Sequence, residues 1–225
     1  MSAAAEKEHT ISIKPHEAEV LKNLVQKYNV NNALEVGLAY GASAMTILGA
    51  NSQLTLTSCD PFQQADYQNS GLDKIAGAGF QSRHTHIKEL SDRALPKLLV
   101  EGKTYDLVFI DGDHKFSGAF VDFHFAAQMI ENNGIVVFHD MWMRALILIR
   151  SYINNNRPDL IEIPLNCANM CAFQRIGQDK RDGMVFNEFF TRKGYIKYHI
   201  NRMAWERKTV FGKTVFKIKM ILKRR

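Results

Sequence analysis

Residues 107–111 are Leu-Val-Phe-Ile-Asp, and residues 135–140 are Ile-Val-Val-Phe-His-Asp. Each apolar run is typical of a buried strand, and residues 116–131 between them are long enough for one crossover helix. The carboxyl ends of such parallel strands meet at one edge of the sheet, where open α/β folds bind their ligands. Four side chains at these strand ends are therefore expected to share one cleft: Asp111, His114, His139 and Asp140.

The same alternation of strands and helices extends over most of the chain. Strands are expected at residues 33–36, 53–58, 83–87, 106–110 and 134–138, and helices at residues 16–28, 42–49, 72–79, 91–100, 116–131 and 142–154. Two later extended runs, 160–164 and 170–176, leave no room for a helix between them and predict an antiparallel hairpin. The expected fold is α/β: a Rossmann-like, doubly wound, seven-stranded sheet, mostly parallel with an antiparallel terminal hairpin.

Length and composition narrow the class of protein. The 225 residues are 46% hydrophobic, which is enough to bury a full core. No apolar run approaches the ~18 residues of a membrane span, and the polar N-terminal segment has no apolar region typical of a signal peptide. The three cysteines, Cys59, Cys167 and Cys171, form no disulfide framework, so we expect a cytoplasmic protein.

A glycine-containing loop follows the first expected strand. Residues 35–43 are Glu-Val-Gly-Leu-Ala-Tyr-Gly-Ala-Ser, and the glycines at 37 and 41 allow a sharp turn close to a ligand. The helix amides beginning near Gly41, with the Ser43 hydroxyl, form a receptor for a carboxylate or phosphate. The loop departs from the dinucleotide pattern GxGxxG, which argues against a nucleotide-dependent oxidoreductase.

Two acids flank this loop. Glu35, before the first glycine, would repel a pyrophosphate and favour a cationic ligand. Asp60 ends the second strand 23 residues after Gly37, where such folds place an acid on ribose hydroxyls. A cationic amino acid joined to a nucleoside without phosphate is S-adenosylmethionine (SAM).

Four motifs make the chain resemble the class I SAM-dependent methyltransferases. Within them it is similar to the metal-dependent O-methyltransferases, both the catechol type and a sugar-modifying branch. The motifs occur in family order and span roughly residues 33–176: LEVGLAYGAS at 34–43, CDPF at 59–62, FIDGDH at 109–114 and VFHD at 137–140. The resemblance implies a methyltransferase domain over residues 1–178, followed by a separate extension over residues 179–225.

The resemblance also implies a set of cofactor contacts. The methionine part of SAM would be held by Glu35, Gly37, Tyr40, Gly41 and Ser43, with Asp111 beside it; Asp60 would contact the ribose, Pro61 and Phe62 one adenine face, and Ser91 the adenine edge. Leu90 stands where relatives often have an acid.

The metal and the base come from the same resemblance. Carboxylates are hard ligands suited to magnesium, with manganese as the alternative. The resemblance makes Asp111 and Asp140 ligands, His139 a third ligand and His114 the base, as in the sugar-modifying branch. His139 departs from the family pattern, and the other interpretation is a histidine that only hydrogen-bonds at the strand end. Catechol-type enzymes place an Asn after the second aspartate; Met141 or Asp140 occupies that position, depending on the alignment.

These residues predict an O-methyltransferase that acts on a hydroxyl of a sugar or other small molecule, because a divalent cation lowers the pKa of a bound hydroxyl and a histidine can take its proton. The alternatives are a phenolic or catechol acceptor, a nucleic-acid acceptor, or a non-catalytic cofactor-binding module. The amine-methylating signature, Asn/Asp-Pro-Pro-aromatic, is absent after the fourth strand, so nucleic acid is the less favoured partner.

The C-terminal segment differs in charge from the rest. Thr191 to Arg225 holds 12 Lys/Arg and one acid, and the remainder holds 17 basic and 22 acidic residues. The segment would either pack on the body or on a second subunit of a homo-oligomer, or bind an anionic membrane surface at the inner face of the membrane.

Overall fold

The computed structural model describes residues 12–183, 187–189 and 192–206, together with 210, 213, 214 and 216. The chain divides into two compact units, Met1–Arg181 and Asp182–Arg225. The first holds the sheet, and the second holds helix α8 (Arg192–Glu206). Most of the tail after Glu206 lies outside the described residues, and so do residues 1–11. No helix in the described part of the chain is long and apolar enough to cross a bilayer.

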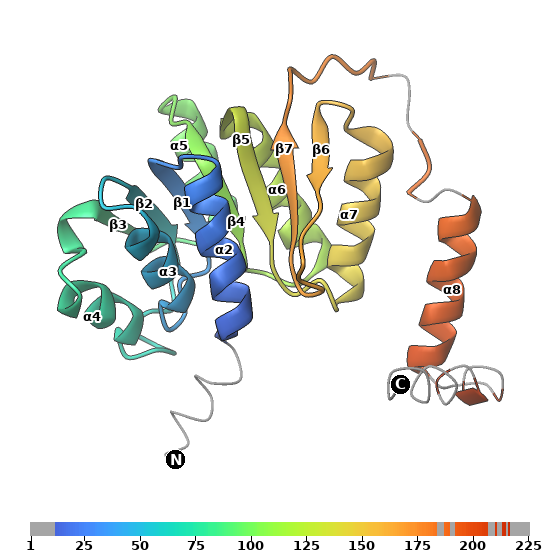
Figure 1. Cartoon of the computed structure of the whole chain (residues 1–225), viewed down its shortest axis with the longest axis horizontal. Helices are drawn as coiled ribbons and strands as arrows, with labels where there is room; N and C mark the ends of the chain where they lie inside the picture. Colours follow the sequence, from blue (N-terminus) through green and yellow to red (C-terminus); the bar gives the residue numbers. More distant parts are fainter. Residues whose placement is uncertain are drawn as a thin grey trace. The chain divides into compact units, whose positions relative to one another are not determined.

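The first unit is built on one seven-stranded sheet in the order β3-β2-β1-β4-β5-β7-β6 (Figure 1). The strands are β1 (Asn32–Val36), β2 (Thr55–Cys59), β3 (His84–Ile87), β4 (Tyr105–Ile110), β5 (Ile130–Phe138), β6 (Leu160–Ile163) and β7 (Cys171–Arg175). The strands from β3 to β5 pair in parallel, whereas β7 pairs antiparallel with both β5 and β6. The predicted fold, including the terminal antiparallel hairpin, is confirmed.

Helices cover both faces of this sheet (Figure 1). They are α2 (Pro15–Lys27), α3 (Ala42–Ala50), α4 (Ser70–Gly77), α5 (Ser91–Val100), α6 (Phe116–Met129) and α7 (Arg144–Asn156), with a 3-10 turn at Gln81–Arg83. Alternate residues of one strand point to opposite faces. In β4, Leu107 and Phe109 therefore pack with α2, α3 and α4, and Val108 and Ile110 pack with α5, α6 and α7.

Several boundaries differ from the expected ones, and two of the shifts have a clear structural reason. β5 begins at Ile130, directly after α6, because Tyr105 of β4 pairs with Ile130 before the register shifts to Leu107–Ile135. Helix α7 begins at Arg144 rather than at residue 142, because Asp140 has a left-handed backbone (φ 56°) and its carbonyl accepts from the Met143 amide at 2.9 Å. Both shifts lie at element ends, where the pattern of apolar residues carries the least information.

Gly37, just after β1, joins two strand ends. Its φ is +90°, and a Cβ atom there would lie 2.4 Å from the carbonyl oxygen of Asp111. Only glycine combines this backbone with this close approach. The loop after β1 can therefore pass over the end of β4 only while residue 37 has no side chain.

We expect Gly37→Ala to lower the free energy of unfolding by about 2–4 kcal/mol, because the clash is with backbone. Gly49→Ala is the matched control: Gly49 is in helix α3, and nothing lies within 4 Å of a Cβ added there. Alanine at 49 should raise the stability by about 0.5–1 kcal/mol. Urea unfolding measures both changes, and equal stability of the Gly37→Ala and wild-type proteins would contradict the expectation.

Candidate active site

A cavity of about 520 Å³ opens at the carboxyl edge of the sheet. Its lining comes from the loop after β1, the ends of β4 and β5, the start of α2 and the segment before β7. The lining residues are Ser12, Ile13, Lys14, Glu17, Gly37, Leu38, Ala39, Tyr40, Ala42, Ser43, Tyr67, Asp111, Gly112, His114, His139, Asp140, Trp142, Met143 and Asn169. The four strand-end residues expected to share a cleft thus line one cavity.

Backbone hydrogen bonds fix where the strand ends lie. The Asp111 amide donates to the Val36 carbonyl at 2.9 Å, and the His139 amide donates to the Ile110 carbonyl at 3.2 Å. The parallel ladder therefore continues one residue past β4 and β5. It sets Asp111 and His139 beside each other without any contribution from their side chains.

Asp60 holds the shape of the glycine loop. Its carboxylate accepts from the backbone amides of Leu38 (3.2 Å) and Ala39 (2.8 Å) on one oxygen and from the Phe62 amide (2.7 Å) on the other. The Gln63 side-chain amide also donates to it at 3.0 Å. These bonds stabilise an unusual loop backbone, with φ of 45° at Ala39.

Glu35 lies beneath the loop and is fully buried. Its carboxylate accepts from the hydroxyls of Ser43 at 2.5 Å and Ser58 at 2.7 Å. Burial raises the pKa of Glu35 to about 7, although these two hydrogen bonds act in the opposite direction. The Ser43 hydroxyl was expected to bind a carboxylate or phosphate of the ligand. In the structure it donates to Glu35 instead.

The predicted cofactor residues therefore fall into two groups. Gly37, Tyr40, Ser43 and Asp111 line the cavity. Glu35, Gly41, Asp60, Pro61, Phe62 and Ser91 lie outside its lining. The cavity thus covers the region expected for the methionine part and the metal, and the adenosine contacts stay predictions.

The three predicted metal ligands converge. One ligand atom from each of Asp111, His139 and Asp140 lies within 4.8 Å of the other two. Nδ1 of His139 is 3.1 Å from Oδ1 of Asp111 and 3.6 Å from Oδ1 of Asp140. Two carboxylates and one imidazole in this span fit a divalent cation that keeps further positions for water or substrate oxygens. Asp140 has a left-handed backbone, which is uncommon for a residue with a side chain.

His114 lies against the same carboxylates. Its Nε2 is 3.0 Å from Oδ2 of Asp140 and 3.6 Å from Oδ1 of Asp111. The two carboxylates, Asp111 first, raise the pKa of His114 to about 10. Burial raises the pKa of Asp140, but the contact with His114 and the nearby His139 outweigh it and lower the value to about 2. A cation and His114 would thus compete for the same oxygens.

Sequence reasoning missed two residues of this site. Glu17, in the first turn of α2, has Oε2 3.1 Å from Nε2 of His139, and the Asn169 amide donates to Oε1 of Glu17 at 2.9 Å. Burial lowers the pKa of His139, but Asp111, Glu17 and Asp140 outweigh it and raise the value to about 9. The sequence carried one signal for Glu17. It lies four residues before Leu21 and seven before Leu24, which places it on the buried face of helix α2.

Trp142 also lines the cavity, although the residue is 60% exposed. Its indole N–H donates to Oδ1 of Asp140 at 3.0 Å. An exposed aromatic ring therefore stands at the edge of the cavity, next to a predicted metal ligand.

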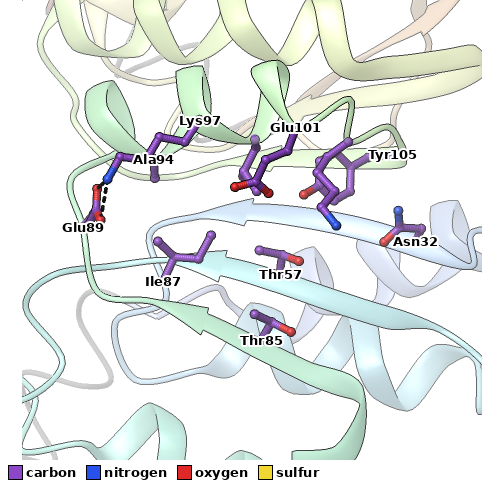
Figure 2. A pocket seen from close by; sticks show the side chains of 11 residues that line it. Asn32, Thr57, Thr85, Ile87, Glu89, Ala94, Lys97, Glu101 and Tyr105 are labelled. Atoms are coloured by element: carbon purple, nitrogen blue, oxygen red, sulfur yellow. Dashed lines mark hydrogen bonds and ion pairs between the residues drawn. The ribbon is translucent and has the colours of Figure 1, made fainter.

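A second hollow of about 470 Å³ lies between α5 and the strands β2, β3 and β4 (Figure 2). Of its two lysines, Lys97 and Lys103, the first is paired with Glu89 at 2.6 and 2.7 Å, as Figure 2 shows. None of the predicted site residues lines it. The chemistry-bearing side chains are gathered in the first cavity.

Residues 34–141 match a protein family described as a methyltransferase domain. Over these residues the chain is similar to a methyltransferase domain. Two proteins of Dictyostelium discoideum, named "Probable caffeoyl-CoA O-methyltransferase 1" and "2", are each 24% identical to it over 136 residues, which are 59% of this chain and 57% of each relative. The chain thus matches little more than half the length of these relatives.

Solved structures share the fold of this domain. An O-methyltransferase from Bacillus cereus in complex with SAH has a TM-score of 0.62 and 17% identity, covering 77% of this chain and 86% of that one. The O-methyltransferase TomG from Streptomyces achromogenes, in complex with SAM, has a TM-score of 0.62 and 15% identity, covering 79% and 91%. The resemblance to metal-dependent O-methyltransferases drawn from the four motifs is confirmed.

Helix α6 of this domain buries a carboxylate, Asp122, with a side chain only 1% exposed. Burial raises its pKa to about 6, and the charges of Asp113 and Asp92 act in the same direction as burial. An acid whose pKa is higher in the folded state binds its proton more tightly there. The free energy of unfolding therefore falls as the pH rises from about 4, the pKa of Asp122 in the unfolded chain, through about 6, its pKa in the folded protein.

Asp122→Asn removes this charge and keeps the shape. We expect its free energy of unfolding to exceed that of the wild type by about 1–3 kcal/mol at pH 8 and to match it near pH 4. Asp92→Asn, at an exposed carboxylate in the first turn of α5, is the control and should show no such gain. Urea unfolding at the two pH values makes the measurement; an equal loss of stability at both would contradict the expectation.

Proposed function

We propose that the chain is a SAM-dependent O-methyltransferase that methylates a hydroxyl of a sugar or other small molecule with the help of a divalent cation, magnesium or manganese. The observation that carries the proposal is the convergence of Asp111, His139 and Asp140 in the cavity that the glycine loop also lines. A methyl donor and a cation held there would lie side by side. The names of the relatives agree with this activity.

The cofactor would lie across the strand ends. In this proposal the loop from Gly37 to Ser43, with Tyr40, holds the methionine part, and Asp111 lies between it and the cation. Glu35 acts from below, through Ser43. Asp60 contacts the ribose, and Pro61, Phe62 and Ser91 surround the adenine. The close packing of Gly37 on the Asp111 carbonyl supports this assignment, because it keeps the loop thin where the cofactor would pass.

The chain's own groups have distinct tasks in the reaction. When bound, SAM supplies an electrophilic methyl group and the cation lowers the pKa of the acceptor hydroxyl. Asp111, His139 and Asp140 orient the acceptor by holding the cation. His114 would be the base: its Nε2, now 3.0 Å from Oδ2 of Asp140, would accept the hydroxyl proton when Asp140 holds the cation, since a base needs a free lone pair.

A phenolic acceptor is the second candidate. The exposed ring of Trp142 at the cavity edge favours it, because aromatic rings stack on one another. Lys14 also lines the cavity, and a lysine base is expected of catechol-type enzymes. His114 beside both aspartates favours the sugar acceptor.

Turnover with SAM should therefore require a divalent cation. With methyl glycosides, catechol and caffeate as trial acceptors, formation of S-adenosylhomocysteine should stop in excess chelator and return with magnesium or manganese. Asp111→Asn and Asp140→Asn should abolish it, and His114→Ala should lose about 100-fold or more. The control Asp73→Asn, at an exposed carboxylate of α4, should keep full rate.

Calorimetry separates the parts of this proposal. The chain should bind SAM with micromolar affinity, about −8 kcal/mol, with or without metal, and Asp60→Ala should lose most of this binding. Absence of SAM binding would overturn the methyltransferase proposal. Full turnover in chelator would overturn the metal, and unchanged turnover of His114→Ala would overturn only the base.

The compartment and the basic extension are also matters of proposal. We place the protein in the cytoplasm, with residues 179–225 as a contact to an anionic membrane surface. In α8, Ile196, Lys197 and Arg202 are exposed, a mixture of apolar and basic groups that suits such a surface. Packing of this segment in a homo-oligomer is the other possibility.

Vesicle co-sedimentation tests the extension. Each basic residue near an anionic bilayer contributes about 1 kcal/mol, and salt screens the attraction. The full chain should therefore bind anionic vesicles at low salt and leave them at high salt. Neutral vesicles are the control. If the chain stays in the supernatant with anionic vesicles at low salt, the membrane proposal is wrong.

A further inference from the structure

Glu17 is held in one orientation at the metal end of the cavity. It is 3% exposed. The backbone amide of Lys14 donates to Oε2 at 2.6 Å, and the side-chain amide of Asn169 donates to Oε1 at 2.9 Å. The Lys14 bond is part of the cap of helix α2, and Asn169 lies just before β7. One bond is local and the other joins Glu17 to a segment 152 residues away. Together they hold the carboxylate beside its third neighbour, His139.

His139 presents its two ring nitrogens to different groups. Nε2 is 3.1 Å from Oε2 of Glu17, and Nδ1 is 3.1 Å from Oδ1 of Asp111 and 3.6 Å from Oδ1 of Asp140. A carboxylate can only accept, so without a cation the Glu17 contact calls for a proton on Nε2 and the Asp111 contact calls for one on Nδ1. A cation bound between Asp111 and Asp140 would replace the Nδ1 proton and leave the Nε2 proton with Glu17, so that the Nδ1 lone pair would face the cation.

We propose that Glu17 is a positioning residue for the cation site: it accepts a hydrogen bond from the Nε2–H of His139 and so directs the Nδ1 lone pair at the point between Asp111 and Asp140. This inference rests on the proposed function, in which His139 is a cation ligand. A carboxylate behind a ligating histidine fixes both the tautomer and the ring orientation, and it strengthens the histidine as a donor.

One competing arrangement exists in the same contacts. The Asn169 amide lies 3.2 Å from Nε2 of His139, so it could donate to a lone pair there. His139 would then carry its proton on Nδ1, donate it to Asp111 and not bind a cation. The Glu17 carboxylate would face that lone pair at 3.1 Å, which is a repulsive contact. Glu17 thus disfavours a lone pair on Nε2, whereas the matching contact of Nδ1 with Asp111 is the one that a bound cation would replace.

A second competing role is direct ligation by Glu17. Its carboxylate also forms a group with His16 and Cys167, whose possible ligand atoms lie within 4.8 Å of one another. Both oxygens of Glu17 are already engaged, by Lys14 and His139 on one side and Asn169 on the other. The positioning role uses these contacts as they are, whereas ligation would have to break them.

Manganese binding measured by electron paramagnetic resonance on the full chain tests the proposal without turnover. Glu17→Gln keeps the size of the side chain but replaces the carboxylate, and it should weaken Mn²⁺ binding about 10-fold; Glu17→Ala should weaken it about 10- to 100-fold. Glu19→Gln, at an exposed acid on the same helix, is the matched control and should bind as the wild type does. SAM affinity, measured in parallel, should stay unchanged in all three.

A double-mutant cycle with His139→Ala separates positioning from ligation. If Glu17 acts through His139, Glu17→Gln should cause no further loss of Mn²⁺ affinity once His139 is absent; an additive loss would mean that Glu17 is itself a ligand and would overturn the proposal. Nitrogen-15 shifts of the His139 ring in the manganese-free protein loaded with Mg²⁺ should place the proton on Nε2. A proton on Nδ1, or Mn²⁺ affinity unchanged in both Glu17 variants, would also overturn it.

The failure of this inference can be told from that of the proposed function. If the wild type binds neither Mn²⁺ nor Mg²⁺, the metal-assisted mechanism and the role of Glu17 both fall. If the wild type binds Mn²⁺ and the Glu17 variants bind it equally well, only the role of Glu17 falls.

Discussion

The parallel hydrogen-bond ladder at the centre of the sheet is the constraint on which the site depends. Because the ladder continues to Asp111 and His139, both residues start from a backbone that is fixed by its neighbours: Asp111 by Val36 and His139 by Ile110. The loop after β1 must then pass over the end of β4, and Gly37 is the residue at which it does so. The side chains of the cavity are thus placed first by backbone geometry and only then by their own contacts.

The second organising force is the concentration of charge in this cavity. Glu17, Asp111 and Asp140 surround His139 and His114, so the two imidazoles act as counter-ions for the carboxylates. In the proposed enzyme a divalent cation would take over this task and release protons, which couples metal binding to protonation. Glu35 and Asp60 are kept apart from this exchange, since hydroxyls and backbone amides already satisfy them.

Local patterns were sufficient for much of this. Uninterrupted apolar runs predicted the parallel strands, and the missing helix before β7 predicted the antiparallel hairpin. The rule that parallel strands end at one edge was enough to bring Asp111, His114, His139 and Asp140 together from residue order alone. The role expected for Asp60 was less complete: its position after β2 was right, but its bonds to the Leu38 and Ala39 amides depend on the path of a loop with left-handed residues.

The sequence by itself determined the order of strands and helices, the edge that bears the site and the identity of its strand-end residues, because these follow from hydrophobic periodicity and from parallel pairing. Only the tertiary structure decided which groups surround His139. Glu17 lies 122 positions before it and Asn169 lies 30 after it, and neither spacing has a local signature. Their approach depends on how α2 and the segment before β7 pack on the sheet, which is a property of the assembled core.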